Sequence, residues 1–286
     1  MKYRLKKAAV LGSGVMGSGI ACHLANIGME VLLLDIVPPQ LDAQQRKDPQ
    51  ARNGWVNTSL QNALRSKPAA LYHKSFASRI KTGNFEDDFE KIADADWIIE
   101  VVIERLDIKR QIFEKVDRLR KAQSLVSSNT SSIPIHLLAE GRSADFKAHF
   151  CGTHFFNPPR YLRLLEVIPT PDTRVEVTQH FMEFGKTALG KQTVLCKDTP
   201  AFIGNRIGVM SGSETFLLTE KYEFSVEEVD ALTGSLIGRP NTATFRLQDL
   251  VGLDTSDNVS RFVTENVKGD RYIDQLKEKP TPKFMR

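Results

Sequence analysis

The sequence of 286 residues is poor in cysteine, in net charge and in long hydrophobic runs. Its three cysteines are widely spaced and form no C-x-x-C pair, so neither a disulfide framework nor a zinc site is indicated. A formal net charge of +4, evenly spread, does not suggest a nucleic-acid partner. No run approaches the roughly 18 apolar residues that span a bilayer. We therefore expect a cytoplasmic protein with reduced thiols, no bound metal, and neither a nucleic-acid nor a membrane partner.

The composition and length instead indicate a folded protein of two domains. The hydrophobic share of 41% and the charged share of 26% are ordinary for globular chains, and domains average roughly 150 residues. Strand and helix patterns alternate along the first two thirds, which is typical of a parallel sheet with helices on its faces. Beyond Val194 the strand patterns disappear. We predict an α/β fold, with a Rossmann-type doubly wound sheet at residues 1–197 and a smaller all-α domain at 198–286.

The expected elements follow from apolar periodicity and from turn residues. Strands are predicted at residues 7–11, 30–35, 97–103, 124–128, 149–156 and 164–168. Helices are predicted at residues 14–27, 106–120, 202–221 and 226–237, with polar helical sequence over 41–81 that Pro49 and Pro68 interrupt.

A glycine motif follows the first predicted strand. Gly12, Gly14 and Gly17 form a G-x-G-x-x-G with Ser13, Val15 and Met16, a helix starts within it, and Asp35 ends the next strand. Such glycines permit a tight turn, a close approach to a pyrophosphate and close packing of helix on sheet. The charge of Asp35 would repel a 2′-phosphate, so we expect NAD as cofactor. The alternative is a glycine-rich turn beside a surface aspartate.

Five further motifs appear in a fixed order along the chain. They are SSNTSS (127–132), HFFNP (154–158), LEV with Glu166, KDTPAFIGNR (197–206) and DLVGLDT (249–255). This ordered set resembles the 3-hydroxyacyl-CoA dehydrogenase family along nearly the whole chain. The resemblance implies an NAD-dependent oxidoreductase of fatty-acid β-oxidation that acts on an acyl-CoA.

The resemblance also implies roles for individual residues. His154 would be the general base, Glu166 its orienting carboxylate, and Ser131 and Asn205 would bind the substrate oxygen. The cofactor site would comprise Gly12, Gly14, Val15, Met16, Gly17, Asp35, Glu104, Lys109, Asn129 and Asn157. Within that set Glu104 and Lys109 would flank the nicotinamide ribose, and Asn157 would also support the surroundings of the histidine.

The chemistry of alcohol oxidation agrees with these roles. A proton must leave the hydroxyl group as the hydride departs, and histidine supplies a base with a pKa near neutrality. A carboxylate on the far ring nitrogen would fix the tautomer and stabilise the imidazolium. The plain alternatives are a histidine packed in a core, Ser131 as a helix N-cap, and Asn205 in the exposed turn of a helix.

The spacing of the base and its carboxylate makes a geometric prediction. If residues 150–156 and 164–168 run antiparallel about a turn centred on Arg160, residues whose numbers sum to 320 lie opposite each other. His154 and Glu166 form such a pair, and directly opposed side chains share one face of a sheet.

The chain also departs from the family pattern. It lacks the Gly-rich, aromatic ending of the single-function members. We therefore expect an incomplete helical domain and a longer parent polypeptide, with a possible enoyl-CoA hydratase module. A homodimer through the helical domain is expected if that domain is complete. Residues 42–81 are longer than usual and hold basic side chains that could meet CoA phosphates, with a solvated helix face as the alternative: Arg46, Lys47, Arg52, Arg65, Lys67, Lys74, Arg79 and Lys81.

Three other functions remain open on the sequence alone. A dehydrogenase of small free 3-hydroxy acids would share the fold, but such enzymes usually place a lysine in the base role. A non-catalytic NAD-binding structural protein is the second alternative, because fold does not fix function. The third is a fragment that binds the cofactor without turnover.

Overall fold

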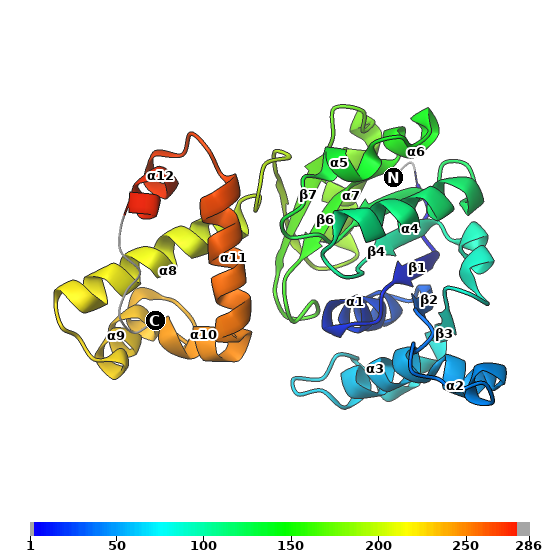
Figure 1. Cartoon of the computed structure of the whole chain (residues 1–286), viewed down its shortest axis with the longest axis horizontal. Helices are drawn as coiled ribbons and strands as arrows, with labels where there is room; N and C mark the ends of the chain where they lie inside the picture. The colour runs from blue at the N-terminus through cyan, green and yellow to red at the C-terminus, as the bar shows by residue number, and fades with distance from the viewer. Residues whose placement is uncertain (1–2, 279–286) are drawn as a thin grey trace. The chain divides into compact units, whose positions relative to one another are not determined.

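The computed structural model describes residues 3–278, which form two compact units, one up to Asp198 and one from Thr199 onward (Figure 1). The first unit contains an eight-stranded sheet in the order β3-β2-β1-β4-β5-β6-β7-β8. Its strands are β1 Lys7–Leu11, β2 Glu30–Asp35, β3 Ile80–Asn84, β4 Trp97–Glu100, β5 Leu125–Ser128, β6 Phe150–Phe155, β7 Leu164–Pro169 and β8 Gln192–Leu195. Only the β6–β7 pair is antiparallel. The predicted Rossmann-type α/β unit followed by a helical unit is confirmed.

Helices cover both faces of this sheet (Figure 1). They are α1 Val15–Asn26, α2 Pro49–Arg52, α3 Gly54–Arg65, α4 Leu106–Leu119, α5 Ile135–Ala139, α6 Ala144–Ala148 and α7 Val175–Thr187, with short 3₁₀ helices at Gln45–Lys47, Lys74–Arg79 and Phe89–Asp94. Apolar side chains of α1, α3 and α7 join those of the strands in one buried core. On α4 and α6, Phe113 and Phe146 pack against Phe150 of β6, with ring centroids 5.0 Å from it.

One expected helical stretch is wrong at its end. The polar helical sequence was expected to continue to Lys81, but Ile80 and Lys81 begin β3, which pairs in parallel with β2 from Val31↔Ile80 to Asp35↔Asn84. Its sequence, IKTGN, lacks the apolar run of a buried strand, so pairing with β2 decides its structure. Pro49 was expected to interrupt a helix, and it is instead the first residue of α2. Asp48 caps this helix, because its side chain accepts from Gln50 N at 2.9 Å.

The second unit is helical throughout its described residues. Its helices are α8 Gly204–Lys221, α9 Val226–Thr233, α10 Phe245–Val251, α11 Leu253–Asn266 and α12 Arg271–Glu278, with a 3₁₀ turn at Ser235–Ile237. Val209, Val263 and Ile273 belong to its small core. Ser225 and Glu228 form a capping box at the start of α9, which satisfies backbone N–H groups there. Among residues 3–278 no helix has both the length and the apolar character needed to cross a membrane.

Candidate active site

The glycine motif forms the turn between β1 and α1. Gly12 has a φ of +106°, a conformation that favours glycine, and a Cβ there would lie 2.6 Å from the carbonyl oxygen of Val101. A Cβ on Gly17 would lie 1.9 Å from the carbonyl oxygen of Gly12, so only glycine allows α1 to approach this closely. Nothing lies within 4 Å of the Cβ position of Gly14. The first turn of α1, with Val15 exposed and Met16 partly buried, is therefore open to a ligand.

Asp35 is tied directly to this turn. Its Oδ2 accepts from the backbone N–H of Ser13 at 2.7 Å and from the Ser13 hydroxyl at 2.5 Å, while its Oδ1 accepts from Ile36 N at 2.7 Å. The carboxylate thus sits at the carboxyl end of β2 beside the start of α1. Ser13 was not singled out from the sequence, although its place inside the motif makes it a neighbour of any bound pyrophosphate.

A pocket of about 370 Å³ adjoins the turn. Ser13, Gly14 and Val15 line it on one side, and Asn157 and Pro159 of the β6–β7 turn line it on another. Lys67 and Pro68, which follow α3, complete part of its wall. Two of the expected cofactor residues from distant parts of the chain, Gly14 and Asn157, therefore line the same pocket.

His154 and Glu166 are directly opposed in the antiparallel β6–β7 pair. Nδ1 of the imidazole lies 2.7 Å from Oε2 of the carboxylate. The Glu166 side chain is fully buried and that of His154 is 6% exposed. The ring of Phe156 packs on the imidazole, with centroids 4.5 Å apart. The predicted pairing about Arg160 is confirmed, and the two side chains share one face of the sheet.

A second buried ionic group lies beneath the 127–132 loop. Lys109 of α4 is 1% exposed, and its Nζ lies 2.6 Å from Oε1 of Glu100 and 3.2 Å from Oε2 of Glu104. Glu100 also accepts from the Ser128 hydroxyl at 2.5 Å and from Val102 N at 2.7 Å. Burial opposes the charge on Lys109, but the two carboxylates outweigh it and raise the pKa of the lysine.

Glu104 connects this ionic group to the loop. Although burial opposes its charge, Lys109 and the loop hydroxyls hold the pKa of Glu104 below its ordinary value. Its Oε1 accepts from the hydroxyls of Thr130 and Ser132, at 2.5 and 2.6 Å, and from the backbone N–H of Ser131 at 3.2 Å. Glu104 therefore shapes the loop that carries Ser131. Glu100 was missed, and its signal was a carboxylate within the apolar run WIIEVVI.

The loop also connects β5 to β6 through Asn129. Its side-chain oxygen accepts from Phe155 N at 2.9 Å, next to His154, and its own N–H donates to the Glu100 carbonyl at 2.8 Å. Ser131 is not a helix N-cap, because α5 begins later, after Pro134. The first N–H groups of α5, at Ile135 and His136, instead donate to the Asp198 carboxylate, at 2.6 and 2.8 Å.

Asn205 belongs to the second unit, where it is the second residue of α8 and is half-buried. Its neighbour Arg206 is bound to Asp270, with a nitrogen–oxygen distance of 2.6 Å. Residues 3–278 contain no group of three or more histidine, cysteine or acidic side chains arranged to hold a metal ion.

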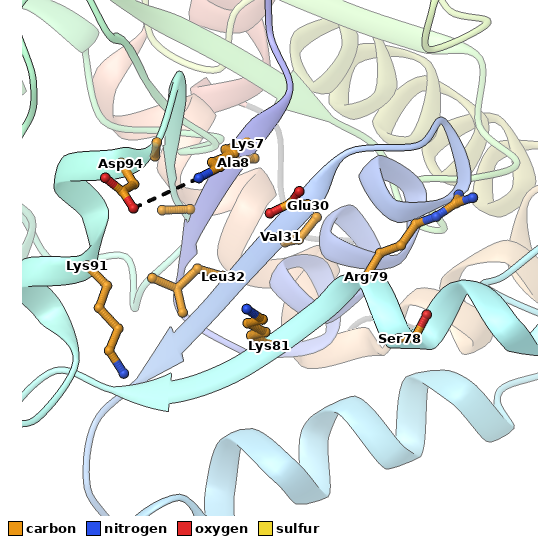
Figure 2. A pocket seen from close by; sticks show the side chains of 12 residues that line it. Lys7, Ala8, Glu30, Val31, Leu32, Ser78, Arg79, Lys81, Lys91 and Asp94 are labelled. Atoms are coloured by element: carbon orange, nitrogen blue, oxygen red, sulfur yellow. Dashed lines mark ion pairs between the residues drawn. The ribbon is translucent and has the colours of Figure 1, made fainter.

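The basic side chains of residues 42–81 do not gather in one place. Arg52 is bound to Asp87 and Glu86, at 2.7 and 2.9 Å, and Lys67 lines the pocket beside the glycine turn. Arg79 and Lys81 instead line a different pocket, of about 520 Å³, which Figure 2 shows at the amino ends of β1, β2 and β3. The glycine turn lies at the carboxyl ends of the strands, so the pocket in Figure 2 is separate from the candidate active site.

Both units of the chain resemble domains of known proteins. Residues 7–199 match the family model described as 3-hydroxyacyl-CoA dehydrogenase, NAD binding domain, and residues 202–283 match its C-terminal domain. A probable 3-hydroxyacyl-CoA dehydrogenase of Bacillus subtilis is 52% identical over 94% of this chain and 35% of its own length. A probable 3-hydroxyacyl-CoA dehydrogenase of Deinococcus radiodurans is 48% identical over 90% of this chain and 72% of its own.

Solved structures give the same result. The crystal structure of 3-hydroxybutyryl-CoA dehydrogenase from Escherichia coli K12 aligns with a TM-score of 0.72 at 29% identity, covering 94% of this chain and 54% of that one. This chain thus spans about a third of the Bacillus relative and about half of the Escherichia coli protein. The matched regions include the glycine turn and the strands that carry His154 and Glu166. The chain belongs to the 3-hydroxyacyl-CoA dehydrogenase family and contains that family's NAD-binding domain.

Proposed function

We propose that this chain oxidises the 3-hydroxyl group of an acyl-CoA by hydride transfer to NAD, as an L-3-hydroxyacyl-CoA dehydrogenase of fatty-acid β-oxidation. The observation that carries the proposal is the 2.7 Å contact between His154 Nδ1 and the fully buried carboxylate of Glu166. The names of relatives that cover most of this chain support the same activity.

The residues of the glycine turn fit a dinucleotide. The open space at Gly14 lets backbone N–H groups approach a pyrophosphate, and the start of α1 favours its negative charge. Asp35 would accept hydrogen bonds from the adenosine ribose, while Glu104, Lys109, Asn129 and Asn157 would surround the nicotinamide end. Bound NAD supplies the hydride acceptor.

The His154–Glu166 pair handles the proton of the reaction. An ionised carboxylate only accepts hydrogen bonds, so Glu166 holds the proton of the neutral imidazole on Nδ1 and leaves the basic lone pair on Nε2. Nε2 takes the hydroxyl proton as the C–H hydride leaves the same substrate carbon. Glu166 then stabilises the imidazolium. Ser131 and Asn205 are proposed to donate to the substrate oxygen, which becomes the carbonyl oxygen of the product.

Further parts of the proposal concern the surroundings of the enzyme. Lys67, at the wall of the pocket, is the best placed of the basic side chains to meet a CoA phosphate. We infer a cytoplasmic protein, because Cys22 and Cys151 are buried free thiols. A homodimer through the second unit is supported by exposed apolar side chains there, such as Leu236, Leu250 and Leu253.

Oxidation of NADH by the purified chain in the presence of acetoacetyl-CoA tests the activity directly. We expect turnover by the wild type, and loss of turnover without loss of NADH binding in His154→Gln, which keeps the size and polarity of the side chain. Turnover with free acetoacetate but not with the thioester would favour the small-acid alternative. NADH binding with no turnover on either substrate would refute the proposed activity for this chain.

A further inference from the structure

Lys191 is a buried lysine whose ammonium group faces no carboxylate in the part of the chain that the structure describes. It precedes β8 and is 4% exposed, and no acidic side chain among residues 3–278 lies within ion-pair distance of it. Its Nζ donates to the carbonyl oxygens of Pro159 and Leu162, the latter at 2.6 Å. The ring of Phe155 lies 5.8 Å from the same atom. Burying an ammonium group costs free energy, and here two carbonyl groups and an aromatic ring, but no carboxylate of the described residues, offset that cost.

Both carbonyl groups belong to the turn between β6 and β7. This turn joins the strand that carries His154 to the strand that carries Glu166. Pro159 also packs on α1, since a Cβ added to Gly19 would lie 3.0 Å from the Pro159 Cδ atom. The same proline lines the pocket beside the glycine turn. Lys191 therefore holds a segment that borders the cofactor pocket and also connects the two residues of the proposed proton-transfer pair.

The other side of the turn is held by bonds to the segment after α3. Arg160 Nη1 donates to the carbonyl oxygens of Ala69 and Leu71, at 2.5 and 2.9 Å, and the Tyr161 hydroxyl donates to Ala69 at 2.9 Å. Arg160 and Tyr161 are partly or largely exposed, whereas the bond from Lys191 to Pro159 is buried. Lys191 is thus the buried anchor of a turn whose remaining side-chain anchors are solvated.

We propose that Lys191 is a positioning residue whose ammonium group fixes the β6–β7 turn against α1 and thereby sets the affinity for the cofactor. The effect on NADH binding stands independently of the proposed catalytic activity. The effect on turnover, through His154 and Glu166, rests on that proposed function.

Protonation of Lys191 provides the distinguishing measurement. Burial lowers its pKa to about 8. Hydrogen bonds from a charged donor are roughly twice as strong as those from a neutral amine, so the anchor weakens above this pH. Among the described residues, His23 on α1 is a titratable group that senses the charge of Lys191, and Arg160 on the turn acts on the same imidazole. Burial, and then Lys191, lower the pKa of His23 to about 4, so His23 does not change its charge between pH 7 and 9.5.

The same titration acts on stability in the opposite direction. The pKa of Lys191 in the folded protein is below that of an unfolded lysine, so its burial destabilises the fold at neutral pH. That destabilisation is relieved as the pH rises through about 8 toward the unfolded value. A lysine with a merely structural role would leave NADH affinity unchanged while the free energy of unfolding rises. Our proposal requires NADH affinity to fall while the free energy of unfolding rises.

The test compares Lys191→Met, Lys191→Arg and the wild type by NADH fluorescence titration between pH 6.5 and 9.5. Lys186→Met is the matched control, because Lys186 is an exposed residue of α7 in the same unit. We expect the wild-type Kd to rise roughly 3- to 10-fold across this range, the scale of losing charge assistance in two hydrogen bonds. Lys191→Met should bind roughly 10-fold more weakly at pH 7 with a flat pH profile, and Lys186→Met should match the wild type.

Lys191→Arg keeps its charge, so its affinity for NADH should not fall above pH 8. If Lys191→Met does not fold, this variant and the wild-type pH profile together test the role of Lys191. Equal Kd values in all proteins at every pH would overturn the proposal. NADH binding with the expected profile but no turnover of acetoacetyl-CoA would leave Lys191 in its role and refute the proposed activity instead.

Discussion

Two lysines are buried among the described residues of the first unit, and their surroundings shift their pKa values in opposite directions. Lys109 lies between Glu100 and Glu104, whose carboxylates raise its pKa against the effect of burial. Lys191 donates to carbonyl oxygens and meets no carboxylate among the described residues, and burial lowers its pKa to about 8. The comparison shows that depth alone does not determine the charge of a buried lysine; the charge of the group that meets its ammonium does.

Removal of the paired lysine should have the largest effect. Lys109→Met leaves Glu100 buried without its counter-charge, which we expect to cost about 3–5 kcal/mol of unfolding free energy. Urea unfolding at pH 7, followed by tryptophan fluorescence, reports on the first unit because Trp55 and Trp97 both lie there. Adding Glu100→Gln to the variant should recover part of the loss. A loss below about 1 kcal/mol would show that the pair is no more important than a surface ion pair.

In the His154–Glu166 pair, the carboxylate is proposed to stabilise a positive charge that forms on the imidazole only during turnover. Glu166→Gln keeps the side-chain size but removes the charge that stabilises the imidazolium. We expect kcat to fall roughly 100-fold or more, while NADH affinity and the unfolding midpoint stay close to wild type. Steady-state assays with acetoacetyl-CoA measure the loss, with Glu183→Gln on the exposed side of α7 as the control. Wild-type kcat in Glu166→Gln would refute the proposed proton-transfer pair.

The lowered pKa of Lys191 should make the free energy of unfolding depend on pH. Between pH 7 and 9 the wild type should gain on the order of 1 kcal/mol relative to Lys191→Met, because the folded protein releases a proton that the unfolded chain retains. The difference between the two urea-unfolding curves cancels the titration of groups that both proteins share. If the wild type gains no unfolding free energy relative to Lys191→Met as the pH rises, the lowered pKa of Lys191 is contradicted.

The fold and the candidate site were predicted most accurately where local motifs and strand spacing determine the structure. The glycine turn, α1 and β2 follow from one short stretch, and the opposition of His154 and Glu166 follows from the length of a hairpin. Both buried lysines were harder to interpret. Lys109 was assigned by resemblance without its partner Glu100, and Lys191, which follows a glycine at the end of a helix, looks like an ordinary exposed residue.

The difference has a physical cause. The Lys191 ammonium group contacts the β6–β7 turn, 29 and 32 residues away in the chain, and His23 of α1 contacts the nearby Leu189 from 166 residues away, so these segments meet only after folding. The strand β3 was missed for a related reason, because its polar sequence becomes a strand only through its pairing with β2. Periodicity within a segment contains no information about such partners.

The smallest effect is expected at a carboxylate that remains partly solvated. Asp35 accepts from the Ser13 hydroxyl and from two backbone N–H groups, so Ser13→Ala removes one of three hydrogen bonds and keeps the charge. One such bond contributes about 0.5–1.5 kcal/mol, which corresponds to roughly 2- to 10-fold weaker NAD binding. The preference for NAD over NADP should persist, since it depends on the charge of Asp35 and not on its anchor. Asp35→Asn should instead reduce that preference strongly. Calorimetric Kd values for NAD and NADP separate the two variants. Equal affinities of the wild type for NAD and NADP would show that Asp35 does not select the cofactor. If Ser13→Ala lost as much of the preference as Asp35→Asn, the position of the carboxylate and not its charge would determine the selection.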